Sequence, residues 1–181
     1  MVFMRPKSKY ERRCNGTVHG TLFIFPKPIM TALYYEDYTE GWTFESDRRT
    51  VTDYDISAFV NLHGFLTPTF QDLDYATETE HYKGRIAPGL LTLCIAEGLL
   101  LQAGLTKRRG IFLMELTPKF KDPVRAGDTL YNLVTLKEKR LTSKPDRSIV
   151  ITDHLVKTTA GATAISYTST RMIKTRAFVE K

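Results

Sequence analysis

The sequence has few of the residues that build metal and redox sites. Its 181 residues include two cysteines, Cys14 and Cys94, and four histidines. The cysteines match no metal-binding spacing, and no glycine-rich phosphate loop is present. Two cysteines that form no such pattern favour a reducing compartment. We therefore expect a cytoplasmic protein with no metal ion and no bound cofactor.

A hydrophobic run long enough to cross a membrane is also missing. The longest apolar stretch, Gly89–Leu101, is interrupted by Thr92, Glu97 and Gly98. A membrane-spanning helix needs about 20 consecutive apolar residues. We expect no membrane span, and the chain length fits one globular domain with a sizeable core.

Net charge is small outside the first residues of the chain. The formal charge is +6, but six of the 26 basic residues and one of the 20 acidic residues fall within residues 1–29. The remaining 20 basic and 19 acidic residues nearly cancel. A nucleic-acid groove needs a basic face, so we expect no nucleic-acid partner for the body of the protein. We expect residues 1–32 to form a poorly ordered basic extension. One alternative is a transit peptide, and another is a leader that precedes a natural start at Met30.

Regular patterns begin after residue 33. Alternation near residues 42–50 predicts a strand. Thr52 and Asp55 resemble a capping box, and the apolar spacing that follows predicts a helix which Gly64 ends. Residues 65–71 are expected to form a loop, because a proline at 68 disfavours a helical residue before it. A short helix capped by Asp72 is expected to reach Thr79.

The second half predicts one long helix followed by strands. Residues 86–104 are apolar on nearly all sides, with Pro88 near the start and Gly104 at the end, as in a helix buried on most sides. Four β-type runs with intervening turns predict an antiparallel meander: 111–121, 128–140, 147–158 and 162–174. A curved antiparallel sheet wrapped around the helix gives an α+β fold, and we expect a second copy to cover the open side.

Several segments together resemble one family, the MaoC-like acyl dehydratases, or R-specific enoyl-CoA hydratases. The resemblance covers about residues 33–174, within an expected domain of residues 33–181. Its most specific parts are Gly84-Arg85-Ile86-Ala87-Pro88-Gly89 and Pro123-Val124-x-x-Gly127-Asp128-Thr129. It implies a hotdog fold, an acyl-CoA thioester as substrate, and a homodimer or an oligomer of dimers. Coenzyme A would enter only as part of the substrate.

The family's catalytic loop is present without its catalytic residues. That loop reads Gly-Asp-x-Asn-Pro-x-His-x-Asp, and Gly64, Pro68 and Asp72 match its frame. The positions of the Asp, the Asn and the His hold Phe65, Thr67 and Phe70. None of the four histidines follows an Asp by five residues: those positions hold Cys14, Ala58, Ala76 and Ile149. A phenyl ring neither activates water nor transfers a proton.

Binding residues are easier to assign than catalytic ones. The resemblance implies that amides at the start of the long helix polarise the thioester carbonyl, which makes Ala87, Gly89 and Leu90 candidates for substrate binding. Phe65, Thr67 and Phe70 are expected to line the acyl group, with ordinary core packing as the alternative for the two phenylalanines.

Two residues are candidates for catalysis. His63 is the nearest remaining imidazole, and the alternative for it is a structural histidine at a helix end. Glu97 lies in the middle of the apolar helix, and the alternative is a carboxylate paired with an arginine or lying at a dimer interface. His81 and Tyr82 are expected in a surface loop or at the cleft entrance.

Three functions remain open from the sequence. The first is an acyl-CoA hydratase or dehydratase that uses His63 or Glu97. The second is a non-catalytic acyl-thioester-binding protein or partner subunit. The third is an acyl-CoA thioesterase, which needs a carboxylate beside the long helix, and Glu97 is the only one within that helix.

Overall fold

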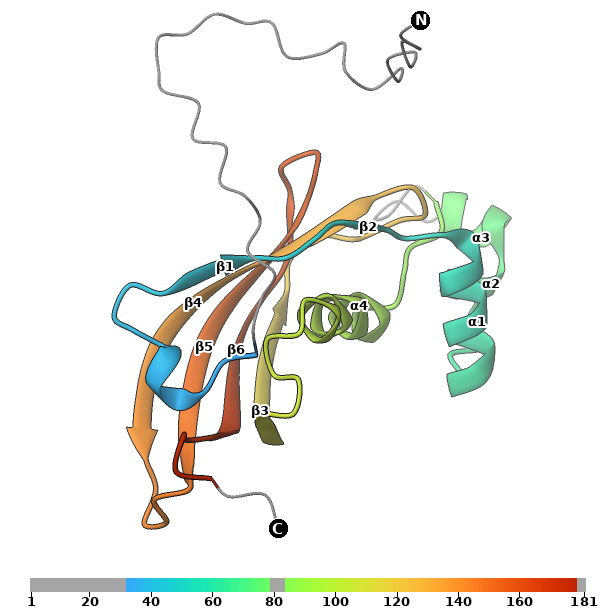
Figure 1. The fold of residues 1–181 in the computed structure, drawn as a ribbon. Helices are drawn as coiled ribbons and strands as arrows, with labels where there is room; N and C mark the ends of the chain where they lie inside the picture. The colour runs from blue at the N-terminus through green and yellow to red at the C-terminus, as the bar shows by residue number, and fades with distance from the viewer. Residues whose placement is uncertain (1–31, 79–83, 179–181) are drawn as a thin grey trace, which may run out of the picture.

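A curved antiparallel sheet wraps around one long helix, α4 (Gly89–Gln102), in the structure of the protein (Figure 1). The structure is a computed structural model that describes residues 32–78 and 84–178. The expected α+β class and helix-in-sheet arrangement are confirmed. The basic extension, except for Ala32, and the pair His81 and Tyr82 lie outside the described residues.

The sheet has six strands in the order β1-β4-β5-β6-β3, with β2 paired to β4. Its strands are β1 (Thr43–Glu45), β2 (Arg49–Thr50), β3 (Gly110–Phe120), β4 (Thr129–Leu141), β5 (Arg147–Thr158) and β6 (Thr163–Lys174). The four long strands fall where the sequence predicts them. The meander prediction is right for β4 to β6 and wrong for β3, which pairs with β6 at the sheet edge. The connection from β3 to β4 therefore crosses from one part of the sheet to another.

The single strand predicted over residues 42–50 is two short strands. Between them, the Ser46 side chain accepts a hydrogen bond from the Asn132 backbone N–H at 2.9 Å. The Ser46 N–H donates to the Asn132 carbonyl at 3.0 Å. A side-chain oxygen thus replaces a backbone acceptor at this point, and the regular pairing with β4 stops and resumes at Arg49.

A 3-10 helix, η1 (Tyr35–Asp37), and three α-helices precede α4: α1 (Asp53–His63), α2 (Pro68–Gln71) and α3 (Leu73–Glu78). The capping box of Thr52 and Asp55 and the end of α1 at Gly64, with φ of 70°, are confirmed. The Asp72 side chain accepts the Tyr75 N–H at 3.0 Å at the start of α3. The loop predicted over residues 65–71 is partly wrong, because the proline that breaks a helix before it also suits the first position of α2.

Helix α4 is buried on most sides, as predicted. Its buried side chains share a core cluster with α1 and with strands β4 to β6. Pro88 lies just before its first residue, and Gly104, with φ of 81°, follows its end. One stripe stays exposed: Leu90, Cys94 and Leu101. No helix in the described part of the chain is long and apolar enough to cross a membrane.

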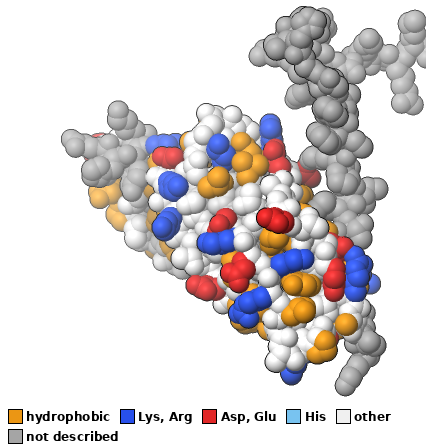
Figure 2. Space-filling model, turned by 90° about the vertical axis from the view of Figure 1, so that its left-hand side faces the viewer, with side chains coloured by type: hydrophobic (Ala, Val, Ile, Leu, Met, Phe, Trp, Pro, Cys, Tyr) orange, Lys and Arg blue, Asp and Glu red, His pale blue; other side chains and the backbone are white. Residues whose placement is uncertain are grey.

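Acidic and basic side chains alternate on the face of the molecule that includes β1 and β4 (Figure 2). No continuous basic area appears on this face. The mixed surface agrees with the near-neutral charge of the body of the protein.

Candidate functional site

An open cleft of about 380 Å³ lies at the start of α4. Its volume falls in the range of small-molecule sites, which is about 300–1,000 Å³. Most of the residues predicted to bind substrate line it: Phe65, Phe70, Ala87, Gly89 and Leu90. Thr67 is not among the lining residues; it precedes α2 with an extended backbone. The structure thus brings together the helix start and the two phenylalanines from separate parts of the sequence.

The start of α4 presents backbone amides without a side-chain cap. Pro88 occupies the cap position and has no N–H to donate. The first bond of the helix runs from the Thr92 N–H to the Pro88 carbonyl at 3.2 Å, so the amides before it have no partner within the helix. Such a helix end carries partial positive charge and suits the oxygen of a polarised carbonyl.

The ring of Phe120, from the end of β3, covers Gly89. A methyl group added at Gly89 would lie 2.8 Å from two ring carbons of Phe120, which is too close for any side chain. The position of the Phe120 ring therefore requires glycine at residue 89, whereas the sequence indicated only a substrate-binding role for Gly89. Phe120 was missed from the sequence because it belongs to the end of a strand far from the loop motif.

Backbone and ring contacts fix the aromatic wall of the cleft. The ring centroids of Phe65 and Phe70 are 6.2 Å apart, and Phe59 lies 5.4 Å from Phe65 on its other side. The Arg85 side chain donates to the Phe70 carbonyl at 2.7 Å and to the Ser57 hydroxyl at 3.0 Å. Arg85 thus ties α2 to α1 and positions the wall, a role that the sequence did not indicate.

The wall also belongs to the core. Phe65 and Phe70 both pack against the buried cluster that includes α4. The two alternatives for these residues, a lining of the cleft and ordinary packing, are therefore both present in the structure.

Neither candidate catalytic residue lines the cleft. His63 is exposed at the end of α1, where its ring lies 4.5 Å from the ring of Phe59. Glu97 follows Gly89 by eight residues, which places it about 12 Å farther along the helix axis. Its carboxylate accepts a hydrogen bond from the Tyr167 hydroxyl at 2.7 Å and forms an ion pair with Arg171. The structure does not bring His63 or Glu97 to the start of α4.

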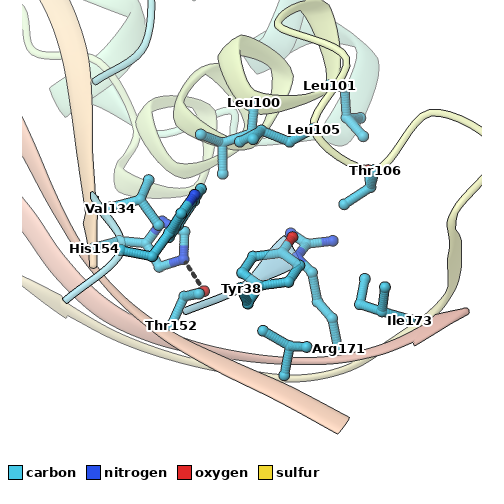
Figure 3. A pocket seen from close by; sticks show the side chains of 12 residues that line it. Tyr38, Leu100, Leu101, Leu105, Thr106, Val134, Thr152, His154, Arg171 and Ile173 are labelled. Atoms are coloured by element: carbon cyan, nitrogen blue, oxygen red, sulfur yellow. Dashed lines mark hydrogen bonds between the residues drawn. The ribbon is translucent and has the colours of Figure 1, made fainter. Parts of the chain in front are cut away.

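A second, much smaller cavity of about 20 Å³ lies between the end of α4 and the sheet (Figure 3). Leu100, Leu101 and Leu105 close it from the helix side, and Thr152 and His154 from the sheet. This volume holds about one water molecule, so the cavity is no substrate site.

Polar groups beside this cavity are held in one protonation state by burial. Burial lowers the pKa of His154 to about 3, and the nearby Arg171 acts in the same direction. Burial raises the pKa of Tyr38 to about 12. Burial, and then the charge of Glu97, raise the pKa of Tyr167. His154 is buried, and its Nε2 lies 2.7 Å from the Thr152 hydroxyl, so its role is structural.

Two charged residues line the cleft that the sequence did not single out. Among the described lining residues, Lys121 and Asp122 are the charged ones. Both backbone N–H groups donate to the Ala164 carbonyl, at 2.9 and 3.4 Å. They lie in the connection that leaves β3, directly before the Pro123-Val124 pair of the family motif. Across the described residues, no three His, Cys, Asp or Glu side chains come together as a metal site would require.

Comparison with known proteins gives one consistent result. The sequence matches the family described as "MaoC like domain" over residues 39–158. It is 31% identical to an (R)-specific enoyl-CoA hydratase of Rhodospirillum rubrum over 143 residues, which covers 79% of this chain and 93% of that protein.

Solved structures agree with this match. A MaoC-like dehydratase from Rhodospirillum rubrum superposes with a TM-score of 0.74 and 26% identity, covering 81% of this chain and all (100%) of that one. A protein from Mycobacterium tuberculosis with a double hotdog fold has a TM-score of 0.70 at 19% identity, covering 83% of this chain and 46% of that one, a likeness of fold alone. The chain therefore belongs to the MaoC-like domain family and has the hotdog fold.

Proposed function

We propose that this protein binds an acyl-CoA thioester in the cleft at the start of α4. The observation that carries the proposal is the helix start itself. This helix start, whose first amides have no partner within the helix, lines a cleft of about 380 Å³ whose other lining residues are mostly apolar. A thioester needs these two features together, donors for its carbonyl oxygen and an apolar surface for its acyl chain. The similarity to an (R)-specific enoyl-CoA hydratase supports this substrate class.

Binding is the part of the family function that the geometry favours most. The cleft includes the helix start, and it is also lined by the rings of Phe65 and Phe70, which the sequence resemblance aligns with the family's acid and base. His63 and Glu97 lie outside the cleft. A non-catalytic thioester-binding protein or partner subunit needs only the groups that line the cleft.

Hydration of an enoyl-CoA is the second candidate, and membership of the family is the observation that favours it. It requires that His63 or Glu97 reach the substrate from outside the cleft. His63 is the last residue of α1 and precedes Phe65, the first residue of the cleft wall, by two positions. Along the chain, His63 is therefore nearer to the cleft than Glu97 is.

One set of measurements separates the two candidates. Crotonyl-CoA and 3-hydroxybutyryl-CoA are titrated into the purified protein by calorimetry, and hydration is followed as loss of enoyl absorbance. Saturable binding without hydration supports the binding function, and hydration abolished by His63→Ala supports the second candidate. Failure of every acyl-CoA to bind, at concentrations up to the millimolar range, refutes the proposal.

We also propose that the protein is a homodimer whose interface includes β3. This strand ends the sheet in the described part of the chain and exposes Ile111, Phe112 and Met114. Phe112 is 66% exposed, and Leu101 of α4 is 61% exposed. An apolar edge strand pairs readily with a second copy of itself. Light scattering should give twice the monomer mass, and Phe112→Lys should reduce that mass, whereas Leu141→Lys on β4 should not.

A further inference from the structure

We propose that Asp122 gives the cleft a hydrolytic activity, in which its carboxylate is the general base that activates water against the thioester carbonyl. This inference rests on the proposed function, since the thioester must first bind at the start of α4. It goes beyond that function because it assigns a reaction, thioester hydrolysis, and a residue to carry it. The substrate class is a saturated or unsaturated acyl-CoA.

The backbone holds Asp122 at the cleft. The N–H groups of Lys121 and Asp122 share the Ala164 carbonyl of β6 as acceptor. Two residues later, the Val124 carbonyl accepts the Ala87 N–H at 2.7 Å, just before α4 begins. Both ends of this short segment are therefore tied to elements that line the cleft. Asp122 lines the same cleft as Gly89 as a result.

The Asp122 carboxylate is not used by the fold. In the part of the chain that the structure describes, it forms no hydrogen bond or ion pair with another side chain. Three other carboxylates have structural roles: Asp55 caps α1, Asp72 caps α3, and Glu97 pairs with Arg171. Asp122 is the carboxylate among the described cleft residues, and Lys121 beside it is the other charged group there.

The chemistry that one carboxylate can perform decides between hydration of an enoyl-CoA and hydrolysis of a thioester. Hydration of a carbon–carbon double bond needs a base for water and a proton for the α-carbon. Hydrolysis of a thioester needs only the base, because thiols have a pKa of about 8.5 and the thiolate leaves without a general acid. A cleft with free amides and a single carboxylate therefore matches hydrolysis better than hydration.

The reaction balances with these groups alone. Asp122 takes a proton from water as the water oxygen bonds to the thioester carbon. The carbonyl electron pair moves to its oxygen, which the amides at the start of α4 stabilise. When that pair returns, the carbon–sulfur bond breaks and the coenzyme A thiolate leaves with its electrons. Asp122 then releases its proton to the thiolate or to water, and the products are a carboxylic acid and free coenzyme A.

The test uses butyryl-CoA and octanoyl-CoA, which have no double bond and so cannot be hydrated. Thiol release by the full-length protein is followed with a chromogenic thiol reagent, after subtraction of the signal from the protein's own cysteines, Cys14 and Cys94. Wild type, Asp122→Asn, Asp122→Glu and the control Asp74→Asn are compared. Asp74 is also exposed and belongs to α3, outside the cleft lining. Binding of each acyl-CoA is measured separately by calorimetry.

We expect Asp122→Asn to lower kcat about 10²–10⁴-fold, with Kd changed little, because only proton transfer is lost. Asp122→Glu should keep part of the activity, and Asp74→Asn all of it. Full kcat in Asp122→Asn overturns the proposal. Binding by the wild type without thiol release also overturns it, while the proposed binding function stands. Absence of binding in the wild type instead removes the proposed function itself.

Discussion

Replacement of Glu97 should reveal a structural residue rather than a catalytic one. Its carboxylate lies between α4 and β6, with the Tyr167 hydroxyl 2.7 Å from Oε1 and the Arg171 guanidinium paired to Oε2. The side chains of Glu97 and Arg171 are 15% and 17% exposed, so water reaches neither freely. Asn132 extends the network by donating to the Tyr167 oxygen at 2.9 Å. Glu97→Ala therefore leaves a nearly buried guanidinium and a buried hydroxyl without their acceptor.

Removal of one partner from a buried ion pair costs about 3–5 kcal/mol. We expect Glu97→Ala to lose about this much free energy of unfolding in urea, with an unchanged m value, and to lower Tm by about 6–20 °C. Glu97→Gln should lose less, because its amide oxygen still accepts from Tyr167. The control Glu138→Ala, on an exposed part of β4, should change stability by less than about 0.5 kcal/mol. A loss below about 1 kcal/mol in Glu97→Ala, together with loss of thioester turnover, would refute the structural role.

Three further outcomes are expected. The double variant Phe65→Asp with Phe70→His should gain hydration of crotonyl-CoA by at least about 10²-fold, measured by enoyl absorbance, and no gain would contradict the assigned loop frame. Gly89→Ala should destabilise the protein by about 1–3 kcal/mol, since its methyl group would meet an aromatic ring, and an unchanged Tm would show that the ring moves aside freely. His154 stays neutral in the fold because its pKa is lowered to about 3, while in the unfolded chain it takes up a proton near pH 6.5. Stability should therefore fall by about 1–2 kcal/mol between pH 7 and pH 5. His154→Gln should remove most of that slope in urea titrations and His63→Gln should not; an equal slope in both variants would contradict the argument.

Local signals account for the parts of the fold that the sequence predicts well. A capping box of Thr52 and Asp55 and a glycine at 64 fix the two ends of α1 through hydrogen bonds between residues a few positions apart. The apolar run of α4 and the four long strands follow in the same way from periodicity and turn residues. Each of these features depends on neighbours in sequence, which a single chain shows directly.

Strand order depends on contacts that no local pattern contains. β3 is followed in the chain by β4, but it pairs with β6, which lies more than 40 residues farther along the sequence. The connection that leaves β3 passes the start of α4, where Val124 bonds to Ala87, and this contact carries the chain away from a simple meander. The same connection brings Asp122 to the cleft. An interpretation based on residues that are neighbours in the sequence therefore misses both the strand order and the position of Asp122 at the cleft.

The two candidate catalysts, His63 and Glu97, lie outside the cleft for geometric reasons. His63 and Phe65 are two residues apart, but Gly64 between them has a left-handed backbone that turns the chain at the end of α1. The histidine stays on the exposed end of the helix while Phe65 turns toward the core. Glu97 shares a helix with Gly89, but eight residues of rise separate them. Nearness along the chain is thus a poor guide at a helix end.

The double variant at positions 65 and 70 should gain catalysis and lose stability together. Both rings pack against the core cluster, and their centroids are 6.2 Å apart. Phe→Ala costs about 3–5 kcal/mol in a full core, and less where a ring is only partly buried, so a loss of about 1–3 kcal/mol per position is reasonable. An ionised Asp beside the same apolar cluster adds a desolvation cost. A variant that gained hydration at unchanged stability would show that the rings contribute nothing to packing. The expected loss of free energy of unfolding, measured by urea denaturation, would show that Phe65 and Phe70 stabilise the core by packing against it.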